Sequence, residues 1–301
     1  MSRVLGRMRA VAFSRPARFL ALGVALAVAV FNIDNAPNAA FAPALLGLAP
    51  WVAGKYILCP LRWHAFSQSG RTRRWHMRAY AESEIFGLMS PGHTGADVWR
   101  VHRLETVGLR RPCAIAEVGL DRLVGAIGLT AFVLLAGASL PPQLLLAAVG
   151  IALAIVAAGF VLARLRPDLM PQRALPPPRA LIRGILLSIA YQLSILALLL
   201  GVVSAVGHSV DPIALLGVFG AAQVAGIIPG VHGASPREGA LVVGLAALGV
   251  PWGAALGAVA LIGLMAWAPA IAFGGTSLLA RRIARRLELR RPAAPAAALA
   301  A

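Results

Sequence analysis

Two stretches of the chain combine helix-breaking residues with charged side chains, and both begin with the same hexapeptide pattern. SPGHTGADVWR (residues 90–100) and IPGVHGASPREG (residues 228–239) each contain P-G-x-x-G-A. A histidine lies inside each break, and an acid and an arginine follow it. Guanidinium groups bind phosphate through two parallel hydrogen bonds, and a helix N-terminus adds unpaired N–H donors. These residue types therefore indicate a site for an anionic head group.

The charged residues that follow the two breaks are the candidate binding residues. In a low-dielectric site an arginine and a carboxylate neutralise one another, and either exchanges its partner for a substrate charge. We expect Arg100 and Arg237 to contact phosphate, with Asp97 and Glu238 holding these arginines while the site is empty. For Asp121 and Arg122, a structural ion pair near the cytoplasmic face is the alternative role. The expected substrate-binding residues are Arg100, Arg237, Asp97, Glu238, Asp121 and Arg122.

The two breaks themselves are expected to act as hinges. Proline and two glycines within six residues interrupt a helix, and at membrane depth the freed backbone groups must be covered by protein or water. Two interruptions in corresponding positions of two halves indicate a transport site at a repeat interface. A turn at the membrane surface is the alternative for each break. The expected hinge residues are Pro91, Gly92, Gly95, Pro229, Gly230 and Gly233.

The histidines of the breaks, His93 and His232, are candidates for proton coupling, because imidazole titrates near neutral pH. Hydrogen bonding within the loop is the alternative role. Lys55 lies inside an apolar segment and is either a functional intramembrane charge or a side chain that reaches the cytoplasmic surface.

The elements that must position these residues are membrane helices. Hydrophobic residues make up 59% of the 301 residues and charged residues 13%, whereas a soluble domain carries about 25% charged residues. Mean hydropathy is +0.79. The composition predicts an all-α polytopic membrane protein with glycine-rich helix breaks or re-entrant segments.

Long apolar runs begin near residues 19, 40, 114, 143, 184 and 253, and two shorter ones cover 212–228 and 239–250. We therefore expect about eight membrane segments in two related halves. The segments expected outside contain no Lys or Arg, and arginines cluster in those expected inside. This distribution places both termini in the cytoplasm.

The expected organisation has five parts: a basic cytoplasmic N-terminus (1–18), a first membrane half (19–163), a proline-rich cytoplasmic connector (164–183), a second membrane half (184–275) and a basic, disordered cytoplasmic tail (276–301). Residues 62–90 are too polar to cross in full. They predict either an interfacial helix with Trp75, Phe86 and Met89 in the lipid or one arm of a re-entrant hairpin.

Several function classes are disfavoured. The net charge of +17 would suit nucleic acid, but the arginines fall in short clusters between apolar segments. Cys59 and Cys113 have no metal or disulfide spacing, and the histidines form no metal motif. A Walker A motif is absent, so direct ATP use is not indicated. We expect no metal, no cofactor and no nucleic-acid partner.

The motifs resemble those of the flippase-like membrane domain family, named for the transmembrane region of lysylphosphatidylglycerol synthase. In that family P-G-x-x-G-x-D-x-x-R precedes an apolar helix that begins with an acid-Arg pair, and a second proline-led break precedes R-E-G. The chain departs from the pattern at HGASP, where Pro236 stands directly before the arginine. The resemblance covers about residues 19 to 280, and the matching residues are Pro91, Gly92, Gly95, Asp97, Arg100, Asp121, Arg122, Arg237, Glu238 and Gly239.

The resemblance implies a stand-alone flippase of the bacterial inner membrane that moves an anionic phospholipid or a polyprenyl-linked lipid between leaflets. Membrane lipids with anionic head groups would be its partners, and it would not be an enzyme. A membrane glycosyltransferase and a non-catalytic subunit or regulator of a lipid- or glycan-modifying enzyme are the alternatives. An intramembrane serine protease is disfavoured, because no histidine follows His232.

Overall fold

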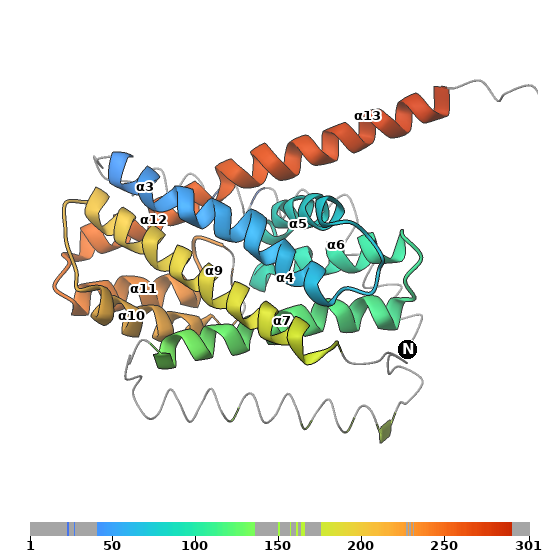
Figure 1. Cartoon of the computed structure of the whole chain (residues 1–301). Helices are drawn as coiled ribbons and strands as arrows, with labels where there is room; N and C mark the ends of the chain where they lie inside the picture. The colour runs from blue at the N-terminus through green and yellow to red at the C-terminus, as the bar shows by residue number, and fades with distance from the viewer. Residues whose placement is uncertain are drawn as a thin grey trace, which may run out of the picture.

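The computed structural model is all-helical over the residues it describes, which are 41–135, 176–226 and 232–290 with the single residues 23, 27, 150, 157, 161, 164, 165, 228 and 230. Eight continuous helices run through these ranges (Figure 1). The predicted all-α fold is confirmed for this part of the chain. The expected N-terminal segment and the spans beginning near residues 19 and 143 lie outside the described residues.

The helices follow one another in two groups. The first group consists of one continuous helix made of α3 (Phe41–Ala53), the π-helical turn η1 (Gly54–Leu58) and α4 (Cys59–Phe66), then α5 (Arg73–Leu88), the 3-10 turn η2 (Pro91–His93), α6 (Thr94–Glu105) and α7 (Arg111–Leu135). The second consists of α9 (Pro178–Ala205), α10 (Pro212–Ala225), α11 (Pro236–Ala247) and one continuous helix made of α12 (Trp252–Pro269), the π-helical turn η4 (Ala270–Gly275) and α13 (Thr276–Arg290).

Three of the described helices are long and apolar enough to cross a membrane: Phe41–Phe66, Pro178–Ala205 and Trp252–Ala284. They coincide with the runs predicted near residues 40, 184 and 253. The run predicted near residue 114 forms α7, a helix of 25 residues that carries several charges. The two short runs form α10 and α11. A multi-pass membrane protein is supported, and eight crossings in two related halves stay a prediction.

The helix Phe41–Phe66 and α9 lie side by side and run in opposite directions (Figure 1). Gly47 opposes Gly201 near one end, and Gly54 opposes Ser194 further along. A Cβ atom added to Gly201 would lie 2.6 Å from the carbonyl oxygen of Pro43. Small residues allow helix backbones to approach this closely, which is a common packing mode between membrane helices.

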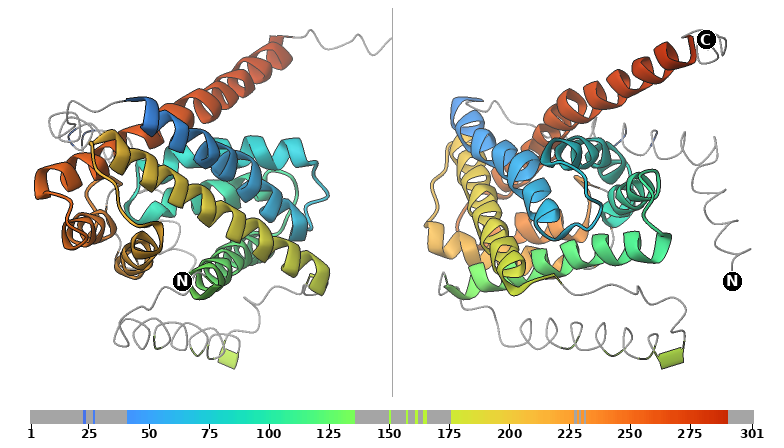
Figure 2. Two further views of the ribbon diagram at one scale, coloured as in Figure 1. Left: turned by 60° about the vertical axis from the view of Figure 1, so that its left-hand side comes forward. Right: turned by 45° about the vertical axis from the view of Figure 1, so that its right-hand side comes forward.

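α5 and α6 form a helical hairpin that turns at η2 and packs within the bundle (Figure 2). Residues 79–84 of α5 are all buried. Trp75 packs against Trp63, and Phe86 stacks on Trp99 with ring centroids 4.4 Å apart. The helical hairpin agrees with one of the two forms predicted for this region, and its entry into a membrane stays a prediction. Trp75 and Phe86, two of the residues expected in lipid in the other form, contact rings of the protein.

The apolar side chains form two separate cores. One core joins α3, α9, α10, α11 and α12 and contains Leu198, Phe219 and Leu245. The other joins α4, α5, α6 and α7 and is built around Trp63 and Leu104. The second core surrounds the charged residues of the first break, so it is the part of the fold that positions the candidate site.

Proline and short polar side chains start several of these helices. Pro178, Pro212 and Pro236 occupy the first helical position, where the missing N–H is not needed. The Asp211 carboxylate accepts a hydrogen bond from the Ala214 N–H at 2.8 Å. These are standard N-terminal signals that the sequence shows directly.

Each π-helical turn lies inside a candidate membrane span and next to a proline. Pro60 follows η1, and Pro269 precedes η4. Because proline lacks an N–H group, it removes one helical hydrogen bond and favours local irregularity. π-helical turns occur frequently at functional sites. Here η1 carries Lys55, whose side chain reaches α5.

Two expected boundaries differ from the structure. Residues 276–290, expected to be a disordered tail, form α13, which continues the helix of α12 through η4. A helix that is already formed extends at little cost, and this segment has strong helix formers. α9 begins at Pro178, so residues 178–183 belong to a helix and not to the expected connector.

Replacing Gly201 with alanine should weaken the packing of α3 against α9. The new Cβ would meet the Pro43 carbonyl oxygen, which belongs to the backbone and cannot rotate away. We expect a loss of about 1–3 kcal/mol of stability, measured by denaturant unfolding in detergent micelles. Gly217 on α10 has no atom near an added Cβ. Gly217→Ala should therefore be neutral or slightly stabilising, and equal unfolding midpoints for the two variants would contradict the packing described here.

Candidate functional site

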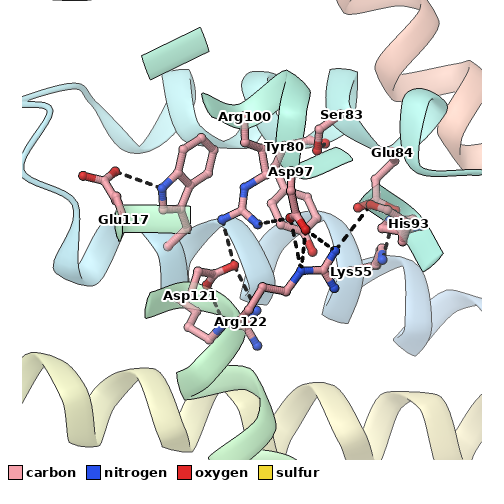
Figure 3. Close-up of polar contacts among 12 residues, drawn as sticks. Lys55, Tyr80, Ser83, Glu84, His93, Asp97, Arg100, Glu117, Asp121 and Arg122 are labelled. Carbon is pink, nitrogen blue, oxygen red and sulfur yellow. Dashed lines mark hydrogen bonds and ion pairs between the residues drawn. The ribbon is translucent and has the colours of Figure 1, made fainter. Parts of the chain in front are cut away.

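The centre of the charged cluster is the carboxylate of Asp121, which binds two arginines (Figure 3). Arg62 donates to its two oxygens from Nε and Nη2 at 2.8 and 3.2 Å. Arg100 donates from Nη2 to Oδ2 at 2.7 Å. Only 1% of the Asp121 side chain is exposed, and both arginines are buried. Buried charges are tolerated only when they are paired, so these contacts are needed by the fold itself.

Three helices supply the charged groups of this cluster, and a fourth supplies a serine that contacts it. Arg62 comes from the middle of α4, Arg100 from α6 and Asp121 from α7. Arg62 also donates from Nη1 to Ser188 Oγ on α9 at 2.9 Å, and Ser188 donates to the carbonyl oxygen of Gly125 at 3.3 Å. The Asp121 cluster, defined as Arg62, Arg100 and Asp121, therefore fixes the relative positions of α4, α6, α7 and α9.

Aromatic rings enclose the guanidinium group of Arg100. Its Cζ lies 4.4 Å from the ring centroid of Trp63 and 5.2 Å from that of Tyr80. Trp63 in turn donates from Nε1 to the buried carboxylate of Glu117 at 2.9 Å. Cation–π contacts gain strength when the cation is desolvated. The rings thus hold Arg100 in one orientation toward Asp121.

Asp97 and Arg122 form an ion pair at the outer edge of the cluster. Arg122 donates from Nε to both carboxylate oxygens at 3.1 Å, and its Nη2 lies 3.0 Å from Oδ2. The Asp97 side chain is 30% exposed and that of Arg122 is 49% exposed. Nη1 of Arg100 lies 3.9 Å from Oδ1 of Asp97. This outer pair is therefore accessible and adjoins the buried cluster.

These partners differ from those predicted by the sequence. Asp97 lies 3.9 Å from Arg100, within ion-pair distance as the sequence predicts, but the shorter contact of Arg100 is with Asp121. Asp121 and Arg122, for which a structural ion pair was the alternative, do not pair with each other: Asp121 binds Arg62 and Arg100, and Arg122 binds Asp97. Adjacent residues on a helix point in different directions, so one faces the interior and the other the edge. The structure does bring all four residues together.

A second buried cluster lies at the first break and joins Lys55, Glu84 and His93 (Figure 3). Lys55 Nζ lies 2.9 Å and His93 Nε2 lies 3.2 Å from the same oxygen of Glu84. The His93 ring packs against Gly87, where a larger side chain would displace it. Lys55 is thus held by a carboxylate inside the bundle.

The backbone of the two breaks meets. The N–H of Gly92 donates to the carbonyl oxygen of Gly230 at 2.9 Å. Gly92 and His93 both have left-handed backbone angles, with φ of 60° and 61°. Gly95 packs against the carbonyl oxygen of Phe86, Pro91 starts η2, and Gly233 also has a positive φ. The breaks predicted as related hinges are in direct contact; Pro229 lies outside the described residues.

The second break does not show the expected pairing of Glu238 with Arg237. Glu238 accepts hydrogen bonds from Ser235 N at 2.9 Å and from Ser235 Oγ, so it caps the start of α11. His232 Nδ1 lies 3.9 Å from Glu238 Oε1. Within the described part of the chain, no ion pair joins Arg237 to a carboxylate. The S-x-x-E capping box in the sequence is the signal that favours this arrangement.

Burial lowers the pKa of His93 and of His232 below the ordinary histidine value. The neighbouring carboxylates Glu84 and Glu238 oppose this shift because they stabilise the protonated ring. Both imidazoles are therefore expected to be neutral at neutral pH. Protonation in the course of a cycle would require local acid or a change in their surroundings.

A third cluster connects the hairpin to the end of the chain. The buried carboxylate of Glu82 lies 3.1 Å from Arg103 Nε and 3.4 Å from Arg281 Nη1. Trp99 and Ser277 donate to it at 3.2 and 3.0 Å. Glu82 thus ties α5 to α6 and to the first turns of α13.

An apolar hollow lies on the outer face of two candidate spans. Its volume is about 370 Å³, and it opens between Ile57 and Leu193, both of which are exposed. The hollow adjoins η1 but is separate from the charged clusters. Its lining residues include Pro50, Ala53, Gly54 and Ser194.

Sequence reasoning missed several members of these clusters, among them Arg62, Glu82 and Glu84. Arg62 was grouped with the arginines that indicate topology, although it lies at the end of an apolar segment. Glu82 and Glu84 stand together in the segment AESE and were treated only as a polar stretch. In a chain with 11 acidic residues, two of them beside small apolar residues are a usable signal of buried ion pairs.

The fold and the site define a helical protein with three candidate membrane spans and buried ion pairs between its helices. Among the described residues, no group of three or more His, Cys, Asp or Glu side chains is placed to hold a metal ion. No protein family, curated protein or solved structure matches the chain. The resemblance to the flippase-like family therefore stays a prediction from the motifs.

Asp121→Asn should be strongly destabilising. The substitution leaves two buried guanidinium groups without their shared negative charge, and loss of one partner from a buried pair costs about 3–5 kcal/mol. Denaturant unfolding in micelles would measure the change. Glu105→Gln removes the partially exposed partner of Arg111 and should cost less than about 1 kcal/mol. A similar small loss for both variants would show that the Asp121 cluster is not required.

Proposed function

We propose that this protein is a lipid flippase or transporter that binds the anionic head group of a phospholipid or polyprenyl-linked lipid and moves it between leaflets of a bacterial inner membrane. The observation that carries the proposal is the accessible Asp97–Arg122 pair lying against the buried Arg100. The resemblance of the two motifs to flippase-like proteins supports the same function.

The head group would bind by replacing a carboxylate. Asp97 neutralises Arg122 and lies within 4 Å of Arg100, so it occupies the position that a phosphate would need. An exposed ion pair is worth at most about 1 kcal/mol, and its partners exchange readily. A phosphate offers more acceptor oxygens than a carboxylate and can engage both guanidinium groups. Asp97 would then act as the counter-ion of the empty site.

The first break would link binding to movement. Nη2 of Arg122 lies 3.5 Å from the carbonyl oxygen of His93, a residue in the left-handed conformation at the hairpin turn. A head group that draws Arg122 away would remove this contact. The Gly92–Gly230 hydrogen bond would carry the change to the second break, where Arg237 is available for the same anion. Two glycine-rich hinges would thus respond to one ligand.

The hydrocarbon part of the substrate would stay in contact with the apolar surface. The hollow between η1 and α9 lies on two candidate membrane spans and is lined almost wholly by apolar atoms. Its volume suits part of one acyl chain. Lys55, inside η1, links the same element to Glu84 and His93, which are candidates for proton coupling. The membrane potential is another driving force, about 2.3 kcal/mol per charge per 100 mV.

The first experiment compares leaflet exchange of fluorescent anionic phospholipid and of a polyprenyl phosphate in proteoliposomes, read by accessibility to a membrane-impermeant quencher. Arg122→Gln should slow exchange about tenfold or more, because one charge-assisted phosphate contact is lost. Asp97→Asn should have the opposite effect on apparent affinity, since it frees both arginines for the lipid. Slower exchange in Arg122→Gln together with tighter apparent lipid binding in Asp97→Asn would indicate an effect on binding, because general destabilisation would impair both variants.

Arg111→Gln is the matched control. Arg111 is as exposed as Arg122 and also pairs with a carboxylate of α6, but this partner, Glu105, lies at the opposite end of α6 from Asp97. This variant should retain exchange within about twofold of wild type. Wild-type rates for Arg122→Gln, or no exchange of either lipid by the wild-type protein, would overturn the proposal.

A further inference from the structure

The last helix, α13, extends away from the bundle, and its rotational position is fixed at its base. Figures 1 and 2 show it projecting beyond the other helices. Ser277 and Arg281 both contact Glu82, with Ser277 Oγ at 3.0 Å from Oε1 and Arg281 Nη1 at 3.4 Å from Oε2. Because these residues lie one turn apart, they orient one side of the helix toward the hairpin. The opposite side must face outward.

The outward side of α13 is amphipathic. Leu279, Ile283 and Leu287 follow one another at four-residue spacing, and their exposed fractions are 59%, 49% and 59%. Arg282 and Arg286 are exposed beside this stripe. Residues four apart lie on one face of a helix. α13 therefore presents a row of large apolar side chains flanked by cations.

The position of α13 relative to the membrane follows from helix length. The continuous helix Trp252–Ala284 has 33 residues, which corresponds to about 50 Å, whereas the hydrocarbon layer is about 30 Å thick. A span that begins at Trp252 would leave the hydrocarbon after about 20 residues. α13, which begins at Thr276, would thus emerge at the level of the lipid head groups.

Charge distinguishes a lipid surface from a second copy of the chain. The sequence of α13 contains five arginines and a single acid, Glu288. A parallel partner helix would place two arginine rows against each other, and like charges repel. Anionic head groups would neutralise the same row while the adjacent bilayer covers the apolar stripe.

We propose that α13 docks with its outward face on the anionic surface of the membrane that α12 leaves, so that Leu279, Ile283 and Leu287 enter the interface and Arg282 and Arg286 bind lipid phosphates. This inference requires that α12 crosses a membrane and that the continuous helix bends at the π-helical turn η4, because an unbent helix would carry Leu287 away from the surface. It is independent of lipid transport. Through Glu82, the docked helix is joined to α6, which carries the candidate head-group residues.

A nitroxide label at Leu287→Cys tests the docking. The label is placed in a Cys113→Ala background, where the remaining Cys59 is buried. The protein is reconstituted in nanodiscs of phosphatidylcholine alone or with about one-third phosphatidylglycerol, a lipid of net negative charge. Collision with a water-soluble nickel reagent should fall severalfold in the anionic discs. At about 1 M salt, where charges are screened beyond roughly 3 Å, the difference should diminish.

The variant Arg282→Gln, Arg286→Gln should lose the protection by anionic lipid. The matched control Arg73→Gln, Arg74→Gln removes the same charge from exposed positions at the start of α5 and should keep it. Equal nickel access in both kinds of disc would overturn the proposal. Dipolar broadening between labels would overturn it too, because it would show that a second copy covers the face.

Discussion

The structure depends on one carboxylate that satisfies two buried guanidinium groups. Asp121 holds Arg62 and Arg100 at hydrogen-bonding distance, and the three residues come from three helices. Each arginine alone would be too costly to bury. If α4, α6 and α7 separated, at least one charge would become exposed or would stay buried without a partner. Ser188 adds α9 to the same constraint. The reversal of the chain at η2 follows from it, because α6 must return alongside α5 to bring Arg100 to Asp121.

The charged groups fall into two layers with different energetics. The inner layer is buried and is enclosed by Trp63 and Tyr80. The outer layer, Asp97 with Arg122, is open to solvent and weakly held. A rigid inner layer gives the outer pair a fixed geometry, and the outer pair remains free to exchange partners. This division would allow one cluster to serve both folding and the proposed binding of a head group.

Much of the local structure could be predicted from the sequence, but the pairing of charges could not. Apolar runs located the helices, and Pro212, Asp211 and the Ser235–Glu238 pattern marked helix starts. The motifs also directed attention to residues that do meet in space. Partner choice, however, depends on how α6 faces α7. Spacing within one helix carries no information on that geometry, so the sequence did not indicate that Asp121 binds Arg62 and Arg100 or that Asp97 lies closer to Arg122 than to Arg100.

The missed residues share a cause. Arg62 stands in a basic segment, and the positive-inside rule alone would explain an arginine there. Only its burial in the bundle shows that it also binds Asp121. α13 was expected to be disordered because the tail beyond it is of low complexity. Its first turns are instead anchored by Glu82, a contact with a residue nearly 200 positions earlier in the chain. Composition describes one segment by itself, whereas the contact that anchors α13 depends on a residue in another segment.

The hydrogen bond between Gly92 and Gly230 has a consequence for how this protein tolerates mutation. Its donor and acceptor are main-chain groups, so among single substitutions only proline at position 92, which lacks the N–H, would delete it directly. Any other substitution would act by reshaping the backbone at a left-handed position, which glycine accepts and most residues resist. A single such bond contributes only about 1 kcal/mol. The hydrogen bond between the two breaks is therefore difficult to remove by mutation but is readily opened by thermal motion.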